Sequence, residues 1–145
     1  MHGIDHAESA WNLGQNLIRS HRLPSSAISI ADARFLPFET ESMDIIYSKM
    51  TLQDLPYVKN SGIGVEAFFK EAKRVLRPRG LIYLIVLHGT TNNMLPFTQE
   101  LNMADIDTLA TQFNLNICHS RIFNLDATQS NLNIGTWMEV ILTLK

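Results

Sequence analysis

Apolar residues recur at helical spacing in three segments of the chain. In 65–76 they fall at every third or fourth position, which is the spacing of an amphipathic helix. Weaker versions of the same pattern occupy 7–18 and 104–113. Pro78 and Gly80 stand where the helix over 65–76 should end, because both residue types disfavour helical continuation. We therefore expect helices over these segments and a turn at 78–80.

Short apolar runs predict strands between and after these helices. The expected strands are 27–31, 44–48, 81–86, 116–123 and 136–144. In 136–144 apolar and polar residues alternate, as they do in a half-buried strand, whereas the Ile45-Ile46 pair suggests burial on both faces of its strand. Alternating strands and helices followed by a terminal hairpin predict an α/β fold. Its sheet should be mostly parallel, with one antiparallel strand near the C-terminus.

Composition narrows the class of protein further. The 145 residues are 46% hydrophobic, which is enough for one domain over 1–145 with its own core. A net charge of −2 argues against a nucleic-acid binder, because phosphate backbones favour a basic face. The longest apolar run, Leu81–Leu87, is far shorter than the roughly 20 residues that cross a bilayer. We expect a soluble cytoplasmic protein that binds neither nucleic acid nor membrane, in which the single Cys118 forms no internal disulfide and is a small buried residue.

Polar residues follow two of the predicted strands and a short segment near the N-terminus. Asp5 follows Gly3-Ile4, Asp32 follows 27–31, and Ser48 ends 44–48. The pattern Glu71-x-x-Arg74-Val75-Leu76-x-Pro78-x-Gly80 then leads from a helix into the strand 81–86. In this order the elements resemble the class I S-adenosylmethionine-dependent methyltransferases, of the methyltransferase type 11 kind. The specific motifs lie between Asp5 and Val86, and the C-terminal third matches by pattern alone.

The resemblance implies a cofactor, S-adenosyl-L-methionine, and a place for it. In this family the cofactor lies across the carboxyl ends of the central strands of a Rossmann-like, doubly wound sheet. Asp5 would accept hydrogen bonds from both ribose hydroxyls, because one carboxylate can serve two donors. Asp32 would accept from the adenine amino group, and the backbone N–H at Ala33 would donate to the ring. Ser48 would lie beside the methionine portion.

Each of these residues also has a purely structural interpretation. Asp5 could be a helix N-cap that forms a capping box with Glu8. Asp32 could cap its own turn, and Ser48 could be the polar end of an ordinary buried strand. The N-terminal histidines near Asp5 are too few ligands for a metal site, so we expect no metal. No residue is assigned a catalytic role, since the family has no universal one.

The 71–80 motif is expected to be structural. Glu71 and Arg74 lie one helical turn apart and can form an ion pair. Arg79 stands where the family usually has the first of two glycines, so a residue with a Cβ atom must tolerate the turn before the next strand.

One part of the family pattern is missing from the chain. The family begins with a strand, a glycine-rich turn and a helix, in which glycines let the backbone approach the cofactor closely. The only G-x-G here, Gly62-Ile63-Gly64, follows no apolar strand and is better interpreted as the entry to the helix at Val65. We therefore expect an incomplete Rossmann-like sheet that lacks the first strand and its following helix, as an N-terminal truncation would leave it.

Two functions follow from this interpretation. The chain could transfer a methyl group to a small-molecule acceptor, or it could be a non-catalytic methyltransferase-like module or gene fragment that another chain completes. Without its first strand, the strand 44–48 should expose an unpaired edge. That edge could pair with 27–31, or it could bind a strand supplied by a second copy or by another chain. Otherwise the chain would be a fragment that folds poorly.

Overall fold

The computed structural model describes residues 2–20, 22, 28–89, 100–124 and 136–145. Its elements are β1 (Gly3–Asp5), α1 (Glu8–Arg19), β2 (Ile28–Ile30), β3 (Met43–Lys49), the 3-10 turn η1 (Leu52–Asp54), α2 (Val65–Val75), β4 (Leu76–Gly89), α3 (Met103–Gln112), β5 (Leu115–Asn124) and β6 (Thr136–Leu144). The expected helices and strands are therefore present, with ends shifted by a few residues. None of the helices in these ranges is both long enough and apolar enough to span a membrane.

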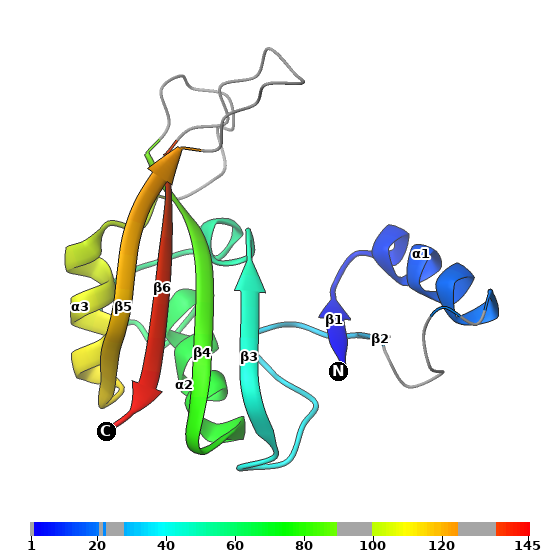
Figure 1. Ribbon diagram of the computed structural model, residues 1–145, viewed down its shortest axis with the longest axis horizontal. Helices are drawn as coiled ribbons and strands as arrows, with labels where there is room; N and C mark the ends of the chain where they lie inside the picture. The colour runs from blue at the N-terminus through cyan, green and yellow to red at the C-terminus, as the bar shows by residue number, and fades with distance from the viewer. Residues whose placement is uncertain (1, 21, 23–27, 90–99, 125–135) are drawn as a thin grey trace.

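The strands form two separate sheets (Figure 1). The larger has the order β3-β4-β6-β5, in which β3 and β4 are parallel and β6 is antiparallel to both of its neighbours. The smaller consists of β1 and β2, paired in parallel, with α1 against them. This confirms an α/β fold that is mostly parallel with one antiparallel strand. Pairing of the 27–31 and 44–48 strands is not seen, because β2 pairs with β1 and β3 pairs with β4.

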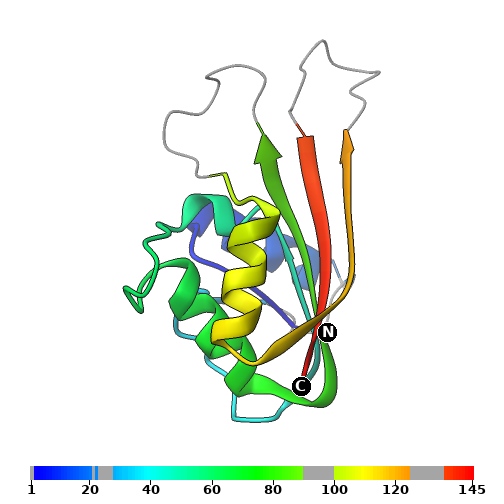
Figure 2. The same cartoon turned by 90° about the vertical axis from the view of Figure 1, so that its left-hand side faces the viewer.

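The core lies between the larger sheet and helices α2 and α3, which cover the same face of it (Figure 2). Alternate residues of β4 and β6 point into this layer, so each strand contributes every second side chain. The fully buried members include Phe69, Ile82, Leu84, Ile106, Leu109, Met138 and Leu142. Burial of this apolar surface is the main stabilising term for the larger sheet.

The passage from α2 into β4 differs from the expected one. The helix ends at Val75 and the strand begins at once at Leu76, whereas the sequence predicted an end at Pro78 and Gly80. The register explains this: Leu76 lies opposite Met43, but the next partner of β3 is Leu81, so residues 77–80 bulge out of the ladder. Within the bulge Arg79 adopts φ +69°, as the sequence predicted for a side chain that must tolerate a tight turn.

The Glu71–Arg74 ion pair is confirmed, and it reaches further than the surface of the helix. Arg74 Nη2 lies 2.7 Å from Glu71 Oε2, and the same guanidinium donates to the carbonyl oxygens of Leu36 (2.9 Å) and Phe38 (2.8 Å). The backbone N–H of Leu36 donates to Glu71 Oε2 at 3.0 Å. These bonds fix the segment 31–42, which connects the smaller sheet to the larger one, on α2.

Two burial predictions are wrong. Ile45 is 62% exposed and Ile46 is only partly buried, because successive side chains of β3 point to opposite faces of the sheet and α2 and α3 cover one of these faces (Figure 2). Cys118 is exposed rather than buried, because it lies in β5, the edge strand of the larger sheet. Both errors concern edge strands, whose positions in a sheet are not visible in a strand's own pattern.

The Glu71–Arg74 contact predicts acid sensitivity. The Arg74 side chain donates hydrogen bonds that hold the pKa of Glu71 below its ordinary value of 4.5. A lowered folded-state pKa contributes stability above the unfolded pKa, and this contribution is lost as the pH falls through the folded pKa. We expect the free energy of unfolding, measured by urea denaturation, to fall less between pH 6 and pH 3 in Glu71→Gln than in the wild type. The exposed Glu39, changed to glutamine, is the control and should retain the wild-type pH dependence; equal slopes for wild type and Glu71→Gln would contradict the role of the ion pair.

Candidate functional site

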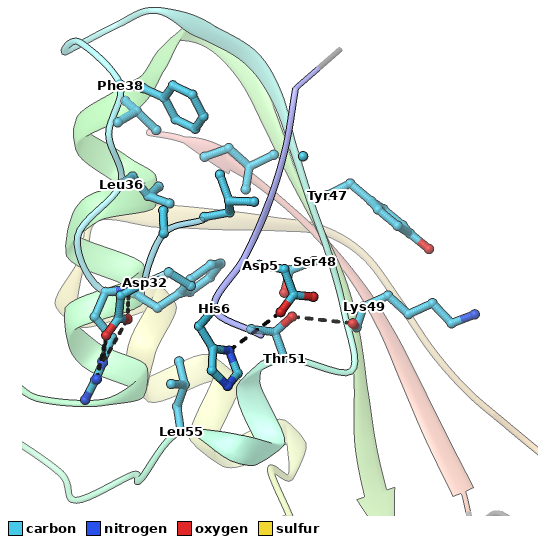
Figure 3. A pocket seen from close by; sticks show the side chains of 18 of the residues that line it. Asp5, His6, Asp32, Leu36, Phe38, Tyr47, Ser48, Lys49, Thr51 and Leu55 are labelled. Carbon is cyan, nitrogen blue, oxygen red and sulfur yellow. Dashed lines mark hydrogen bonds and ion pairs between the residues drawn. The ribbon is translucent and has the colours of Figure 1, made fainter. Parts of the chain in front are cut away.

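A cavity of about 560 Å³ lies between the two sheets. It is bounded on one side by β1 and the residues that follow β2, and on the other by β3 and the residues that follow it. Figure 3 shows polar side chains, among them Asp5 and Ser48, near the carboxyl end of β3, and Leu36 and Phe38 toward its amino end. Because parallel strands bring their carboxyl ends to one edge, three strand ends meet at this cavity.

Asp5 lies at the carboxyl end of β1 and lines the cavity. Its Oδ1 accepts a hydrogen bond from the backbone N–H of Ala7 at 2.8 Å, and His6 Nδ1 lies 3.8 Å away. The capping box with Glu8 does not form, because α1 begins at Glu8 with Ala7 as its N-cap. Among the described residues no donor reaches Oδ2 of Asp5, so that oxygen can accept from a ligand.

Asp32 follows β2, and its carboxylate is engaged by Arg34. Oδ1 accepts from the backbone N–H of Arg34 (2.8 Å) and from its Nε (2.9 Å), and Oδ2 accepts from Nη2 (2.5 Å). These bonds lower the pKa of Asp32, so its carboxylate remains charged at neutral pH. The turn interaction that the sequence allowed for Asp32 is therefore present. The backbone N–H of Ala33, the residue after Asp32, donates to no acceptor in the described part of the chain.

Ser48 lies near the carboxyl end of β3 and lines the same cavity. Ser48 is 7% exposed, and its Oγ has no hydrogen-bond partner among the residues that the structure describes. A buried hydroxyl without a partner costs free energy, so a polar ligand that bonded to Oγ would recover that cost. The structure thus brings Asp5, Asp32, Ala33 and Ser48 to one cavity.

The cavity also has lining residues that the sequence did not predict, in the segment after β3. Lys49, Met50 and Thr51 line it directly beyond Ser48, and Asp54 follows in η1. Met50 adopts φ +59°, a conformation that a residue with a side chain rarely takes. Such backbone outliers gather at functional sites, but they leave no sign in the sequence. The available signal was position alone, immediately after the carboxyl end of a parallel strand.

The G-x-G segment lies at the entry to α2, as the sequence predicted. Gly64 is the N-cap of α2 with φ +58°, and a Cβ atom there would lie 1.8 Å from the carbonyl oxygen of Pro56. The buried carboxylate of Glu66 accepts from the backbone N–H groups of Asn60 and Gly62. Those N–H groups are thus satisfied from within the chain, and the segment does not line the cavity between the sheets.

The N-terminal histidines contact residues of the chain itself. His2 Nε2 lies 2.8 Å from Ser29 Oγ, and its ring packs edge-on against Phe38 with 5.1 Å between centroids. No three histidine, cysteine, aspartate or glutamate side chains cluster as metal ligands within the described ranges.

The chemistry available at the cavity is recognition of a polar ligand. Asp5 Oδ2 can accept hydrogen bonds from hydroxyls, the Ala33 N–H can donate one, and Ser48 Oγ can do either. A negatively charged carboxylate at each of two adjacent strand ends suits a ligand that is rich in donors, such as a nucleoside. The apolar side chains of Leu36 and Leu55 also line the cavity.

Comparison with known proteins agrees with this architecture. A SAM-dependent methyltransferase from Methanosarcina mazei superposes with a TM-score of 0.72 at 18% identity, covering 99% of this chain and 82% of that one. A SAM-dependent methyltransferase from Thermotoga maritima, described as a possible histamine N-methyltransferase, has a TM-score of 0.70 at 13% identity, covering 99% and 72%. The [4+2]-cyclase SpnF has a TM-score of 0.71 at 13% identity, covering 98% and 65%. At such identities these likenesses establish the fold, and no curated protein matches the chain in sequence.

The family is established by sequence. The profile of the methyltransferase domain matches residues 1–84, which is more than half of the 145 residues and includes every strand end at the cavity. Together with the α/β fold, this match shows that the chain belongs to the class I methyltransferase domain family.

Proposed function

We propose that this chain binds S-adenosyl-L-methionine between its two sheets and takes part in methyl transfer to a small-molecule acceptor. Asp5 binds the ribose, Asp32 and Ala33 bind the adenine, and Ser48 contacts the methionine portion. The single observation that supports this most strongly is the convergence of the carboxyl ends of β1, β2 and β3 on one cavity. Open parallel sheets bind their ligands at such a place.

The groups at the cavity fit the cofactor in three respects. Ser48 Oγ is buried without a partner among the described residues, Oδ2 of Asp5 is available to a diol, and the Ala33 N–H is available to a ring nitrogen. When bound, the cofactor supplies a methyl group on a positively charged sulfur. Three carboxylates, of Asp5, Asp32 and Asp54, line the cavity against two cations, Arg34 and Lys49, and this excess of negative charge favours such a cation.

The contribution of the chain is alignment. Transfer of an activated methyl group requires the acceptor, carbon and sulfur to lie in line, and holding reactants in place supplies much of the acceleration. We therefore assign no catalytic residue. In this proposal residues 1–145 form a single partial methyltransferase domain. The protein acts in the cytoplasm.

A second candidate function is supported by the Arg34–Asp32 ion pair. Arg34 occupies the carboxylate that the adenine would need, and fold alone does not fix an activity. If Arg34 stays paired with Asp32, adenine cannot bind to that carboxylate. The chain would then be a non-catalytic methyltransferase-like module. The two functions differ in whether the cofactor binds.

Calorimetry with S-adenosylhomocysteine, the demethylated product, tests the proposal. We expect binding, and a loss of affinity of about 10- to 100-fold in both Asp5→Asn and Asp32→Asn, because hydrogen bonds to charged groups contribute roughly 1.5–3 kcal/mol. Asp44→Asn is the matched control, since Asp44 is an exposed aspartate of β3 that pairs with Arg77 and does not line the cavity. Absence of heat with the wild-type chain, or equal losses in all three variants, would contradict cofactor binding at this site.

The Arg34–Asp32 ion pair gives a further prediction. If adenine and Arg34 compete for one carboxylate, Arg34→Ala should bind S-adenosylhomocysteine severalfold more tightly than the wild type. Lys49→Ala serves as the control, because it removes another cavity-lining cation that makes no described contact with Asp32. A severalfold loss of affinity in Arg34→Ala would show instead that Arg34 holds the Asp32 carboxylate in its binding position.

A further inference from the structure

The two sheets present unpaired edges to each other. β1 is paired only with β2, and β3 only with β4, within the part of the chain that the structure describes. Figure 1 shows β1 and β3 pointing in the same direction with no strand between them. The cavity of about 560 Å³ fills this position and is lined from both sides.

The backbone groups on these edges can be assigned from the hydrogen bonds of their neighbours. Met50 N–H donates to the Ile85 carbonyl of β4 at 3.0 Å, so by alternation the backbone groups of Ile45, Tyr47 and Lys49 point away from β4. On the other side, the Asp5 carbonyl accepts from Ala31 N–H at 3.0 Å, so the backbone groups of Ile4 point away from β2. Each edge thus offers donors and acceptors to the space between them.

The cavity is longer than a site at the strand ends requires. Besides the polar residues at the carboxyl ends, it continues along β3 to Met43 and Ile45, with Phe68 and Val75 of α2 as its floor. Apolar side chains dominate this part, and Ile45 is 62% exposed. An apolar channel between two open parallel edges has the shape and the hydrogen-bonding groups for a strand.

We propose that this channel, between β1 and β3, binds an extended apolar segment of another polypeptide as a parallel strand. The added strand would join the two sheets into one, in the order β2-β1-added strand-β3-β4-β6-β5. Since β3 is 7 residues long, about seven residues of the partner would fill the channel. Because α2 and α3 cover one face of the larger sheet (Figure 2), the partner segment needs an apolar residue at least at every second position, and β-branched residues such as Val and Ile favour the strand.

A second copy of this chain is a poor source for that segment. The longest apolar run in the sequence, Leu81–Leu87, is part of β4, which is hydrogen-bonded to β3 on one side and to β6 on the other. Donating it would dismantle the core of the copy that supplied it. The proposed partner is a different polypeptide that carries a free apolar segment. The inference does not depend on cofactor binding, because the channel binds backbone along β3 and the test contains no nucleoside.

The test uses a fluorescein-labelled peptide of seven alternating valines and leucines, with two lysines before them and two glycines after them. We expect the 145-residue chain to bind it, measured by fluorescence anisotropy, and a peptide with proline at the central position to bind at least about tenfold more weakly, because proline lacks the N–H that the ladder needs. Ile45→Lys should weaken binding by about tenfold or more, since it places a charge on the channel edge. Ile122→Lys is the matched control, because Ile122 is a comparably exposed isoleucine (52%) on the opposite edge strand β5.

Hydrogen exchange of the wild-type chain gives a second measurement that does not depend on the folding of the Ile45→Lys and Ile122→Lys variants. Peptide binding should slow exchange of the Ile45 and Tyr47 amides, which point into the channel, and leave the amides of β5 unchanged. Failure of the peptide to bind would overturn the proposal. Equal binding of the proline peptide, or binding that leaves the Ile45 and Tyr47 amides unprotected, would overturn it as well, because apolar adhesion would then explain the signal.

Discussion

The hydrogen bonds between Arg74, Glu71 and the segment 31–42 are the interaction on which the site depends. No backbone ladder joins the two sheets in the described ranges, so their relative position is fixed by this segment and by the packing of His2 on Phe38. Arg74 binds the carbonyl oxygens of Leu36 and Phe38 through one planar group, which restricts both position and orientation. The same contact therefore holds the segment that begins with Asp32 beside the cavity that Ser48 also lines.

The candidate site is a consequence of strand direction. β1, β2 and β3 run the same way, so the residues that follow them gather at one edge, whatever the sequence between them. The outcome is a cavity whose carboxyl end is polar and whose remaining length is apolar. One end suits a donor-rich ligand, and the rest suits a strand. Both proposals thus use the same space, and a strand of about seven residues along β3 would reach Ser48 at its polar end.

Much of this fold could be predicted from the sequence because its elements have strong local patterns. The apolar spacing of α2 and the alternation of β6 require no knowledge of neighbours, and Arg79 was recognised as a side chain in a turn. Exposure of Ile45 and of Cys118 could not be predicted, because it depends on which strand lies at an edge and on which face of the sheet the helices cover. The Arg34–Asp32 ion pair and the φ of Met50 were missed for a similar reason: side-chain choice and backbone strain depend on the folded surroundings.

Chemical-shift mapping tests the central claim, that the strand ends form one ligand site, most directly. The 15N-labelled chain would be titrated with S-adenosylhomocysteine while its backbone amides are followed by NMR. The geometry predicts shifts concentrated at Asp5, Ala33 and Ser48, with little change at Ile122 on the far edge of the sheet. Shifts confined to the Gly62–Gly64 segment, or none at saturating ligand, would contradict it.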